Sequence, residues 1–213
     1  MSNWLDLFKH TQININQYFD QIYYINLDRR KDRLLSIQQQ LSLYNIQATR
    51  ISGIELSSNN HQINNGQLGC LLSHLYIIGD AINNQYHRIL ILEDDTIFKD
   101  NFLELFSRLV GYLPDQWDML YLCGNHFGGR EYVNEYVYRS YGTLSTNAYA
   151  INQSIIFKIY DLLTQQPYQQ PIDSIYCSLH PNITTYSSAA NICYQMAGFS
   201  DIENKITDYH VLK

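Results

Sequence analysis

The sequence has few charged residues and lacks any long apolar run. Asp, Glu, Lys and Arg make up 16% of the 213 residues, and the acids outnumber the bases by 20 to 14. The formal net charge of -6 argues against a general nucleic-acid-binding surface, so we expect no nucleic-acid partner. No apolar run approaches the roughly 18 residues that a membrane-spanning helix needs, so we also expect no transmembrane segment.

Cysteines are few as well. Cys70, Cys123, Cys177 and Cys193 are widely spaced and form no CxxC motif. Because no signal peptide is recognisable either, this distribution predicts reduced, buried thiols in a cytoplasmic protein. Hydrophobic residues are abundant, at 46%, with 19 tyrosines among them, which excludes a disordered chain. The length fits one domain over residues 1–213, and we expect residues 1–20 to form a peripheral segment on it.

The hydrophobic pattern alternates between strand-like and helix-like segments. Short apolar runs predict strands at 22–27, 47–52, 89–92 and 117–124. Helical spacing predicts helices over 29–44, 68–82, 102–109 and 153–163, with a short helix near 171–180. Further strands are predicted within 131–140, 143–151, 183–188 and 190–195. The order predicts an α/β fold with a mostly parallel central sheet flanked by helices, and with some antiparallel strands in the C-terminal half.

Three adjacent carboxylates follow the most apolar predicted strand. Glu93, Asp94 and Asp95 come directly after residues 89–92, so they are expected beyond the carboxyl end of a buried strand, where α/β proteins bind ligands. Adjacent carboxylates repel one another unless a positive charge lies among them. A divalent cation, Mg²⁺ or Mn²⁺, is the simplest such charge. The structural alternative is a solvated turn in which Asp95 caps the next helix.

A basic run at residues 29–31 lies in the first turn of the first predicted helix, where positive charge opposes the helix dipole. Asp28, the expected N-cap, and Asp32 would compensate this charge. Alternatively, arginines of this turn, among them Arg29 and Arg33, would meet a phosphate group.

Isolated polar residues allow two interpretations each. His74, next to Ser73 on the helix over 68–82, is either a hydrogen-bonded core residue or a ligand-binding residue. Gly69 marks either a close backbone approach to a ligand or a simple turn. Asp173 is either a helix cap or a general base, and His210 is either solvated or a further metal ligand.

Three blocks, YINLDRRKDR, GQLGCLLSH and LILEDDTIF, in this order and spacing, resemble glycosyltransferase family 25, the family of lipopolysaccharide-type and collagen galactosyltransferases. The resemblance extends over residues 22–195 and includes WDMLYLCG, GTLSTNAYAIN and PIDSIY. It implies a GT-A fold and inverting transfer of a hexose, galactose before glucose, from a UDP-sugar to a hydroxyl of a glycan or protein acceptor. It also implies a divalent metal, Mn²⁺ or Mg²⁺.

The resemblance implies roles for the residues that match family positions. The LEDD block matches the family's DxD-like motif, which makes Asp95 the main metal ligand, with Glu93 and Asp94 contacting metal, ribose or water. Asp173 matches the position of the candidate base. The expected donor-binding residues are Asn26, Asp28, Arg29, Arg33, Ser73 and His74.

Two departures from the family pattern support an alternative function. Gln67 stands where the family usually has Glu, and Ser174 stands where a second acid often follows Asp173. These losses would fit a catalytically inactive module that retains nucleotide-sugar or glycan binding. A metal-dependent nucleotide phosphohydrolase or nucleotidyltransferase is a further alternative, because carboxylates at a strand end would serve that chemistry too.

Overall fold

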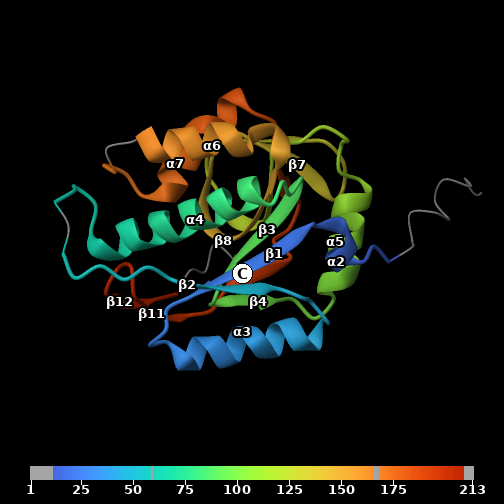
Figure 1. The fold of residues 1–213 in the computed structure, drawn as a ribbon. Coiled ribbons are helices and arrows are strands. Elements are labelled where there is room, and N and C mark those ends of the chain that lie inside the picture. The colour runs from blue at the N-terminus through green and yellow to red at the C-terminus, as the bar shows by residue number, and fades with distance from the viewer. Residues whose placement is uncertain (1–11, 59, 166–167, 209–213) are drawn as a thin grey trace, which may run out of the picture.

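An eight-stranded sheet forms the centre of the molecule (Figure 1), and its strands follow the order β2-β1-β3-β8-β5-β9-β7-β6. The computed structural model describes residues 12–58, 60–165 and 168–208. The strands of the central sheet are β1 (Gln21–Asn26), β2 (Thr49–Ser52), β3 (Arg88–Glu93), β5 (Met119–His126), β6 (Arg130–Tyr132), β7 (Val137–Ser140), β8 (Thr143–Asn152) and β9 (Thr185–Ser188). Two antiparallel pairs accompany it, β4 (Thr96–Phe98) with β10 (Cys193–Gln195), and β11 (Gly198–Ser200) with β12 (Lys205–Thr207).

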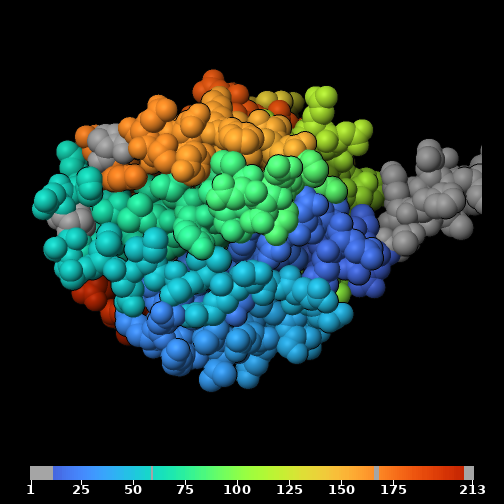
Figure 2. All heavy atoms as spheres, in the orientation of Figure 1, coloured from blue at the N-terminus to red at the C-terminus, as the bar shows by residue number. Residues whose placement is uncertain are grey.

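Helices cover both faces of this sheet. The helical elements are α2 (Ile15–Tyr18), α3 (Lys31–Leu43), α4 (Asn65–Asn83), α5 (Phe102–Gly111), α6 (Gln153–Gln165), α7 (Ile172–Leu179) and the 3-10 helix η1 (His180–Asn182). The α2, α3 and α5 helices pack on one face, and α4, α6 and α7 pack on the other. Figure 2 shows α3, α4 and α6 as successive bands across one side of the molecule.

Most strands of the sheet point the same way. β1 pairs in parallel with both β2 and β3, and β5 pairs in parallel with β9. β8 runs antiparallel between β3 and β5, and β7 adds antiparallel pairs with β9 and β6. The predicted α/β fold, with antiparallel strands in the C-terminal half, is confirmed.

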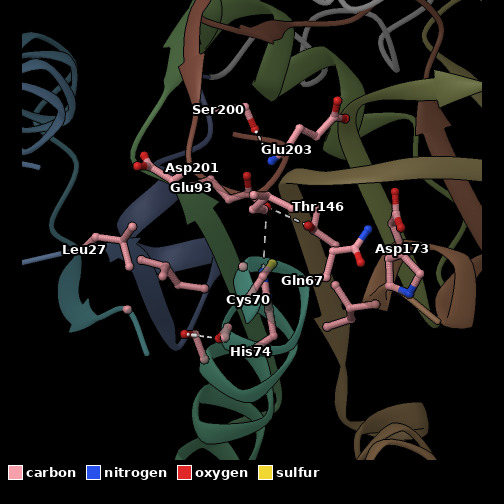
Figure 3. A pocket seen from close by; sticks show the side chains of 18 of the residues that line it. Leu27, Gln67, Cys70, His74, Glu93, Thr146, Asp173, Ser200, Asp201 and Glu203 are labelled. Atoms are coloured by element: carbon pink, nitrogen blue, oxygen red, sulfur yellow. Dashed lines mark hydrogen bonds and ion pairs between the residues drawn. The ribbon is translucent and has the colours of Figure 1, made fainter. Parts of the chain in front are cut away.

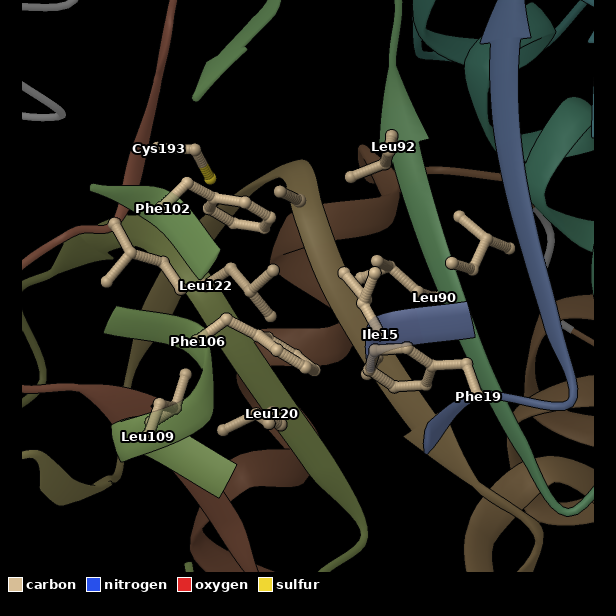
Figure 4. Close-up of a cluster of buried hydrophobic side chains, with 14 of the residues drawn as sticks. Ile15, Phe19, Leu90, Leu92, Phe102, Phe106, Leu109, Leu120, Leu122 and Cys193 are labelled. Atoms are coloured by element: carbon tan, nitrogen blue, oxygen red, sulfur yellow. The ribbon is translucent and has the colours of Figure 1, made fainter. Parts of the chain in front are cut away.

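β3 shows why an unbroken apolar run forms a central strand. Successive side chains of a strand point to opposite faces, so Leu90 and Leu92 enter the core beside α2 and α5 (Figure 4), whereas Ile89 and Ile91 enter the core beneath α4 and α6. All four side chains are fully buried. Full burial of each contributes about 1.5–3 kcal/mol, which fixes this strand and the position of the acidic residues that follow it.

The predicted elements are present within a few residues, with local differences. Asp28 is not the N-cap of α3, because Arg30 occupies that position without a side-chain cap bond. Asp95 precedes strand β4 and not a helix. The β11–β12 hairpin was not predicted, because its three-residue strands are too short and polar to show a clear pattern.

Residues 1–20 were expected to form a peripheral segment. Residues 1–11 lie outside the described residues, and Ile15 and Phe19 are buried in the core.

All four cysteines are free thiols. Two of them are buried, while Cys70 and Cys177 are half-buried. Among the helices described, none is long and apolar enough to cross a bilayer.

Candidate active site

A cavity of about 580 Å³ opens beyond the carboxyl ends of β1, β2, β3 and β5 (Figure 3). The ends of these strands, the first turns of α4 and α7, the start of β8 and the β11–β12 hairpin supply its walls. Ligands of α/β sheets bind at this edge because parallel strands bring their carboxyl-terminal loops together there. The cavity is therefore the candidate active site.

Arg33 links two of the three adjacent carboxylates. Its Nη1 atom lies 3.0 Å from Asp94 Oδ1 and 3.0 Å from Asp95 Oδ2, and all three side chains are buried. Asn26 also donates a hydrogen bond of 2.7 Å to Asp94 Oδ2. A guanidinium thus provides the positive charge that the adjacent carboxylates require.

The Asp95 carboxylate is bonded on both oxygens. Asn147 donates to Asp95 Oδ1 at 2.8 Å, and Gln195 donates to Asp95 Oδ2 at 3.0 Å, in addition to the contact with Arg33. Burial and the neighbouring charge of Glu93 raise the pKa of Asp95 to about 7. A metal ion at Asp95 would have to displace Arg33, so this arrangement does not fit a cation held between Asp94 and Asp95.

Glu93 lines the cavity as the two aspartates do, but it differs from them because it forms no ion pair with Arg33. Thr146 Oγ1 donates a hydrogen bond of 2.6 Å to Glu93 Oε1, and His74 Nε2 lies 3.8 Å from the same oxygen. Cys70 lies one turn before His74 on α4, and its sulfur approaches the same place (Figure 3). Of the three carboxylates, Glu93 is the one that no arginine contacts among the described residues.

The β11–β12 hairpin closes one side of the cavity through ion pairs. Asp201 pairs with Arg29 Nη1 at 2.7 Å and also with Arg30 Nη1, while Arg29 Nε lies 2.6 Å from Glu55. Arg33 donates to the carbonyl oxygen of Phe199 at 2.8 Å. The basic run at the start of α3 is therefore compensated by a distant hairpin.

Asp28 and Asp32 do not share equally in that compensation. Asp32 pairs with Arg30 at 2.7 Å, and this interaction holds the pKa of Asp32 well below its usual range. Asp28 instead pairs with Arg50 at 2.5 Å and is exposed.

The first turns of α4 pack tightly on the chain around the cavity. A Cβ atom on Gly69 would lie 2.2 Å from the carbonyl oxygen of Ile54, so only glycine fits there. Ser73 donates to the Gly69 carbonyl at 2.7 Å and accepts from the Ile54 amide at 2.8 Å. Gly69 therefore allows a close approach of the protein's own backbone, and Ser73 positions the loop after β2.

Asp173 stands on the opposite side of the cavity, in the first turn of α7 (Figure 3). The amides of Ser145 and Ser174 donate to its two oxygens at 3.2 and 2.8 Å, and Pro171, not Asp173, is the N-cap. Ser145 has a positive φ of 85°, an uncommon conformation for a residue with a side chain, and its amide meets the Asp173 carboxylate.

The cavity brings together most of the residues named from the sequence. Those that line it are Arg29, Arg33, Ser73, His74, Glu93, Asp94, Asp95 and Asp173. Asn26 is buried behind Asp94, Asp28 lies outside the cavity, and His210 lies outside the described residues.

Sequence reasoning missed several lining residues. They are Cys70, Thr146, Gln195, Asp201 and Glu203. The i, i+4 spacing of Cys70 and His74 on a predicted helix was a usable signal, because it places both side chains on one face. Asp201 gave no comparable signal, since its partners lie about 170 residues earlier.

The lining is strongly acidic. Two arginines face seven acids, namely Glu55, Glu93, Asp94, Asp95, Asp173, Asp201 and Glu203. The arginines and the hairpin contacts account for most of these, but neither Glu93 nor Asp173 pairs with Lys or Arg within the part of the chain that the structure describes. An anionic ligand would therefore need additional positive charge.

Curated proteins similar to this chain include active and inactive glycosyltransferases. Mouse "Inactive glycosyltransferase 25 family member 3" is 29% identical over 140 residues, which cover 54% of this chain and 23% of that protein. Human "Procollagen galactosyltransferase 2" is 26% identical over 128 residues, covering 49% of this chain and 20% of that protein. The matched segments thus span less than a quarter of the length of these relatives.

Solved structures with a similar arrangement are more distant. A glycosyltransferase involved in the glycosylation of the major capsid of PBCV-1 has 10% identity and a TM-score of 0.45, over 78% of this chain and 80% of that one. A UDP-glucose pyrophosphorylase complexed with UDP-glucose has 12% identity and a TM-score of 0.48, over 82% and 75%.

The family model described as glycosyltransferase family 25 (LPS biosynthesis protein) matches residues 19–125. This segment is half of the chain, and it carries β1, the α3 arginines, α4 and the three adjacent carboxylates. The chain belongs to glycosyltransferase family 25.

Proposed function

We propose that the protein transfers a hexose, galactose or alternatively glucose, from a UDP-sugar to a hydroxyl group of a glycan or protein acceptor, with inversion at the anomeric carbon. The observation that carries this proposal is the cavity of about 580 Å³, built largely by the segment that matches family 25 and large enough for a nucleotide sugar. The name of the human relative, a procollagen galactosyltransferase, supports galactose as the hexose.

The donor diphosphate belongs at the α3 and α4 side of the cavity. The amino end of α4 lines the cavity with Asn65, Gly66 and Gln67, and helix amino ends attract phosphate groups. Arg29 lines the same side and is half-exposed, and a phosphate bound there would compete with Glu55 and Asp201 for its guanidinium. A divalent cation bound at Glu93 would add the positive charge that this acidic cavity lacks and would stabilise the leaving diphosphate.

Asp173 is the proposed general base. The Ser145 amide holds its carboxylate at the opposite wall, where no Lys or Arg among the described residues neutralises it. As the acceptor oxygen attacks the anomeric carbon, its proton passes to Asp173, the new glycosidic bond forms, and the bond to the diphosphate breaks with release of UDP. General-base catalysis of this kind contributes typically 10²- to 10⁴-fold.

The alternative is a binding module without turnover. Arg33 already occupies the position between Asp94 and Asp95, and mouse and human relatives are named as inactive. This alternative shares the donor cavity and differs only in chemistry.

A panel of UDP-sugars, tested for binding and for UDP release in the presence of Mn²⁺, separates these possibilities. We expect one UDP-sugar to bind and to release UDP slowly to water. Asp173→Asn should lower that release by about 10²- to 10⁴-fold while binding persists. Asp115→Asn, at an exposed residue outside the cavity, should leave release unchanged. Binding without release, with or without candidate acceptors, would support the inactive module, and failure of every UDP-sugar to bind would refute both.

A further inference from the structure

We propose that Cys70, His74 and Glu93 form an open binding site for a transition-metal ion, best suited to Zn²⁺. One ligand atom from each of the three residues lies within 4.8 Å of the others, and all three residues line the cavity. Cys70 and His74 are one turn apart on α4, and Glu93 ends β3 (Figure 3). The site shares Glu93 with the proposed transfer reaction, but it is defined by its own geometry and its test needs no sugar nucleotide.

His74 provides an observation independent of the clustering. The residue is fully buried, and its Nε2 atom has no hydrogen-bond partner. A buried polar atom without a partner is destabilising, so such an atom on the wall of a cavity indicates a missing ligand.

The other ring nitrogen of His74 is held in place. Its Nδ1 lies 2.8 Å from Tyr149 Oη, which in turn lies 3.3 Å from Tyr176 Oη. When Nδ1 donates its hydrogen to Tyr149, Nε2 carries a free lone pair directed at the Glu93 side. Metal-binding histidines are typically oriented by this kind of bond at the second nitrogen.

The distance from His74 to Glu93 suits a bridging ion better than a direct bond. The Nε2 and Oε1 atoms are 3.8 Å apart, which is too long for a hydrogen bond. A tetrahedral Zn²⁺ bonded to both atoms at about 2.0–2.2 Å would separate them by roughly 3.4 Å. A shift of a few tenths of an ångström would therefore bring these two atoms to the separation that a shared ion requires.

The donor set selects the class of ion. One thiolate, one imidazole and one carboxylate favour Zn²⁺, whereas Mg²⁺ and Mn²⁺ prefer oxygen ligands. On binding, the Cys70 thiol releases its proton to solvent and the sulfur bonds the metal, with no change of oxidation state. Because three protein ligands leave the fourth position toward the cavity, a water molecule or a ligand oxygen would complete the tetrahedron.

Cobalt spectroscopy on the full chain tests this site without any sugar nucleotide. The protein is treated with chelator, kept reduced, and titrated with Co²⁺, followed by competition with Zn²⁺. We expect one ion per chain, a thiolate-to-cobalt charge-transfer band, and loss of that band when Zn²⁺ is added. Cys70→Ser should abolish the band, whereas Cys177→Ser, at another half-buried free thiol, should retain it.

Affinity measurements provide a second readout. Tyr149→Phe keeps the ring but removes the group that orients His74, so Zn²⁺ binding should weaken about 10- to 100-fold. Urea unfolding of each variant without metal checks that it is folded. The proposal is overturned if the stripped protein binds neither ion, if bound Co²⁺ shows no thiolate band, or if Cys177→Ser removes the band as Cys70→Ser does.

Discussion

Replacing Arg33 with methionine should destabilise the fold strongly. Arg33 Nη1 lies 3.0 Å from both Asp94 and Asp95, and the three side chains have exposed fractions of only 11%, 9% and 3%. Methionine would fill most of the volume but leave two carboxylates buried without a cation. Removing one partner of a buried ion pair typically costs 3–5 kcal/mol, and we expect a loss of about that size.

Urea unfolding followed by circular dichroism measures this loss. With an m-value of about 2–3 kcal/mol/M, a loss of about 3–5 kcal/mol lowers the midpoint by roughly 1–2.5 M. Arg29→Met is the matched control, because Arg29 lines the same cavity and is also ion-paired, but its side chain is 52% exposed. Exposed ion pairs contribute about 0–1 kcal/mol, so its midpoint should move little.

A rescue variant separates charge from packing. If the buried carboxylates cause the loss, Asp94→Asn and Asp95→Asn introduced together with Arg33→Met should recover much of it, because the neutral amides need no cation. A loss for Arg33→Met within 1 kcal/mol of that for Arg29→Met would refute the reasoning, and so would a triple variant no more stable than the single one.

Three further predictions concern the scaffold, each checked by urea unfolding. Gly69→Ala should cost about 1–3 kcal/mol, because its methyl group would meet a backbone oxygen at 2.2 Å, whereas Gly79→Ala, with its nearest neighbour at 3.5 Å, should stabilise α4 by up to about 1 kcal/mol. Phe106→Ala should cost about 3–5 kcal/mol, and Phe157→Ala, at an exposed ring, less than about 0.5 kcal/mol. Burial lowers the pKa of His180 from 6.5 to about 4. The neutral, buried imidazole therefore contributes up to about 3 kcal/mol to the free energy of unfolding above pH 6.5, and this contribution is lost as the pH falls toward 4. His180→Gln should remove that part of the pH dependence of stability, and an unchanged profile would contradict the assignment.

The sequence predicted the sheet because its signals are local. The run at 89–92 alternates between two cores, and each residue meets apolar neighbours whichever face it enters. The amphipathic spacing of α4 and α5 is visible in the same way. Element type therefore followed from neighbouring residues, without knowledge of the long-range contacts.

The β11–β12 hairpin shows what local signals leave out. Its strands have three residues each, and its contribution to the cavity rests on Asp201, which pairs with Arg29 and Arg30 from the start of the chain. The family-like pattern ends at Gln195, before this hairpin begins. Ion pairs between residues so far apart depend on the completed fold, so no spacing in the sequence predicts them.

The three adjacent carboxylates were expected to need positive charge, and the Arg33 guanidinium supplies part of it, while metal binding by Asp95 stays a prediction. Arg33 pairs with Asp94 and Asp95, whereas Glu93 pairs with His74, so the three carboxylates differ in their partners. The aspartates join α3 to the carboxyl end of β3, while Glu93 turns into the cavity beside His74.

This division makes the stability and metal predictions independent of each other. Arg33 already pairs with both buried aspartates, so removing a metal should leave the fold largely intact, whereas removing Arg33 should not. Conversely, the charge still missing from the cavity lies at Glu93 and Asp173, where a negatively charged diphosphate would otherwise be repelled. Chelation should therefore affect ligand binding far more than the unfolding midpoint, and a midpoint that falls by more than about 1 M urea on chelation would show that the metal, and not Arg33, holds this edge of the sheet together.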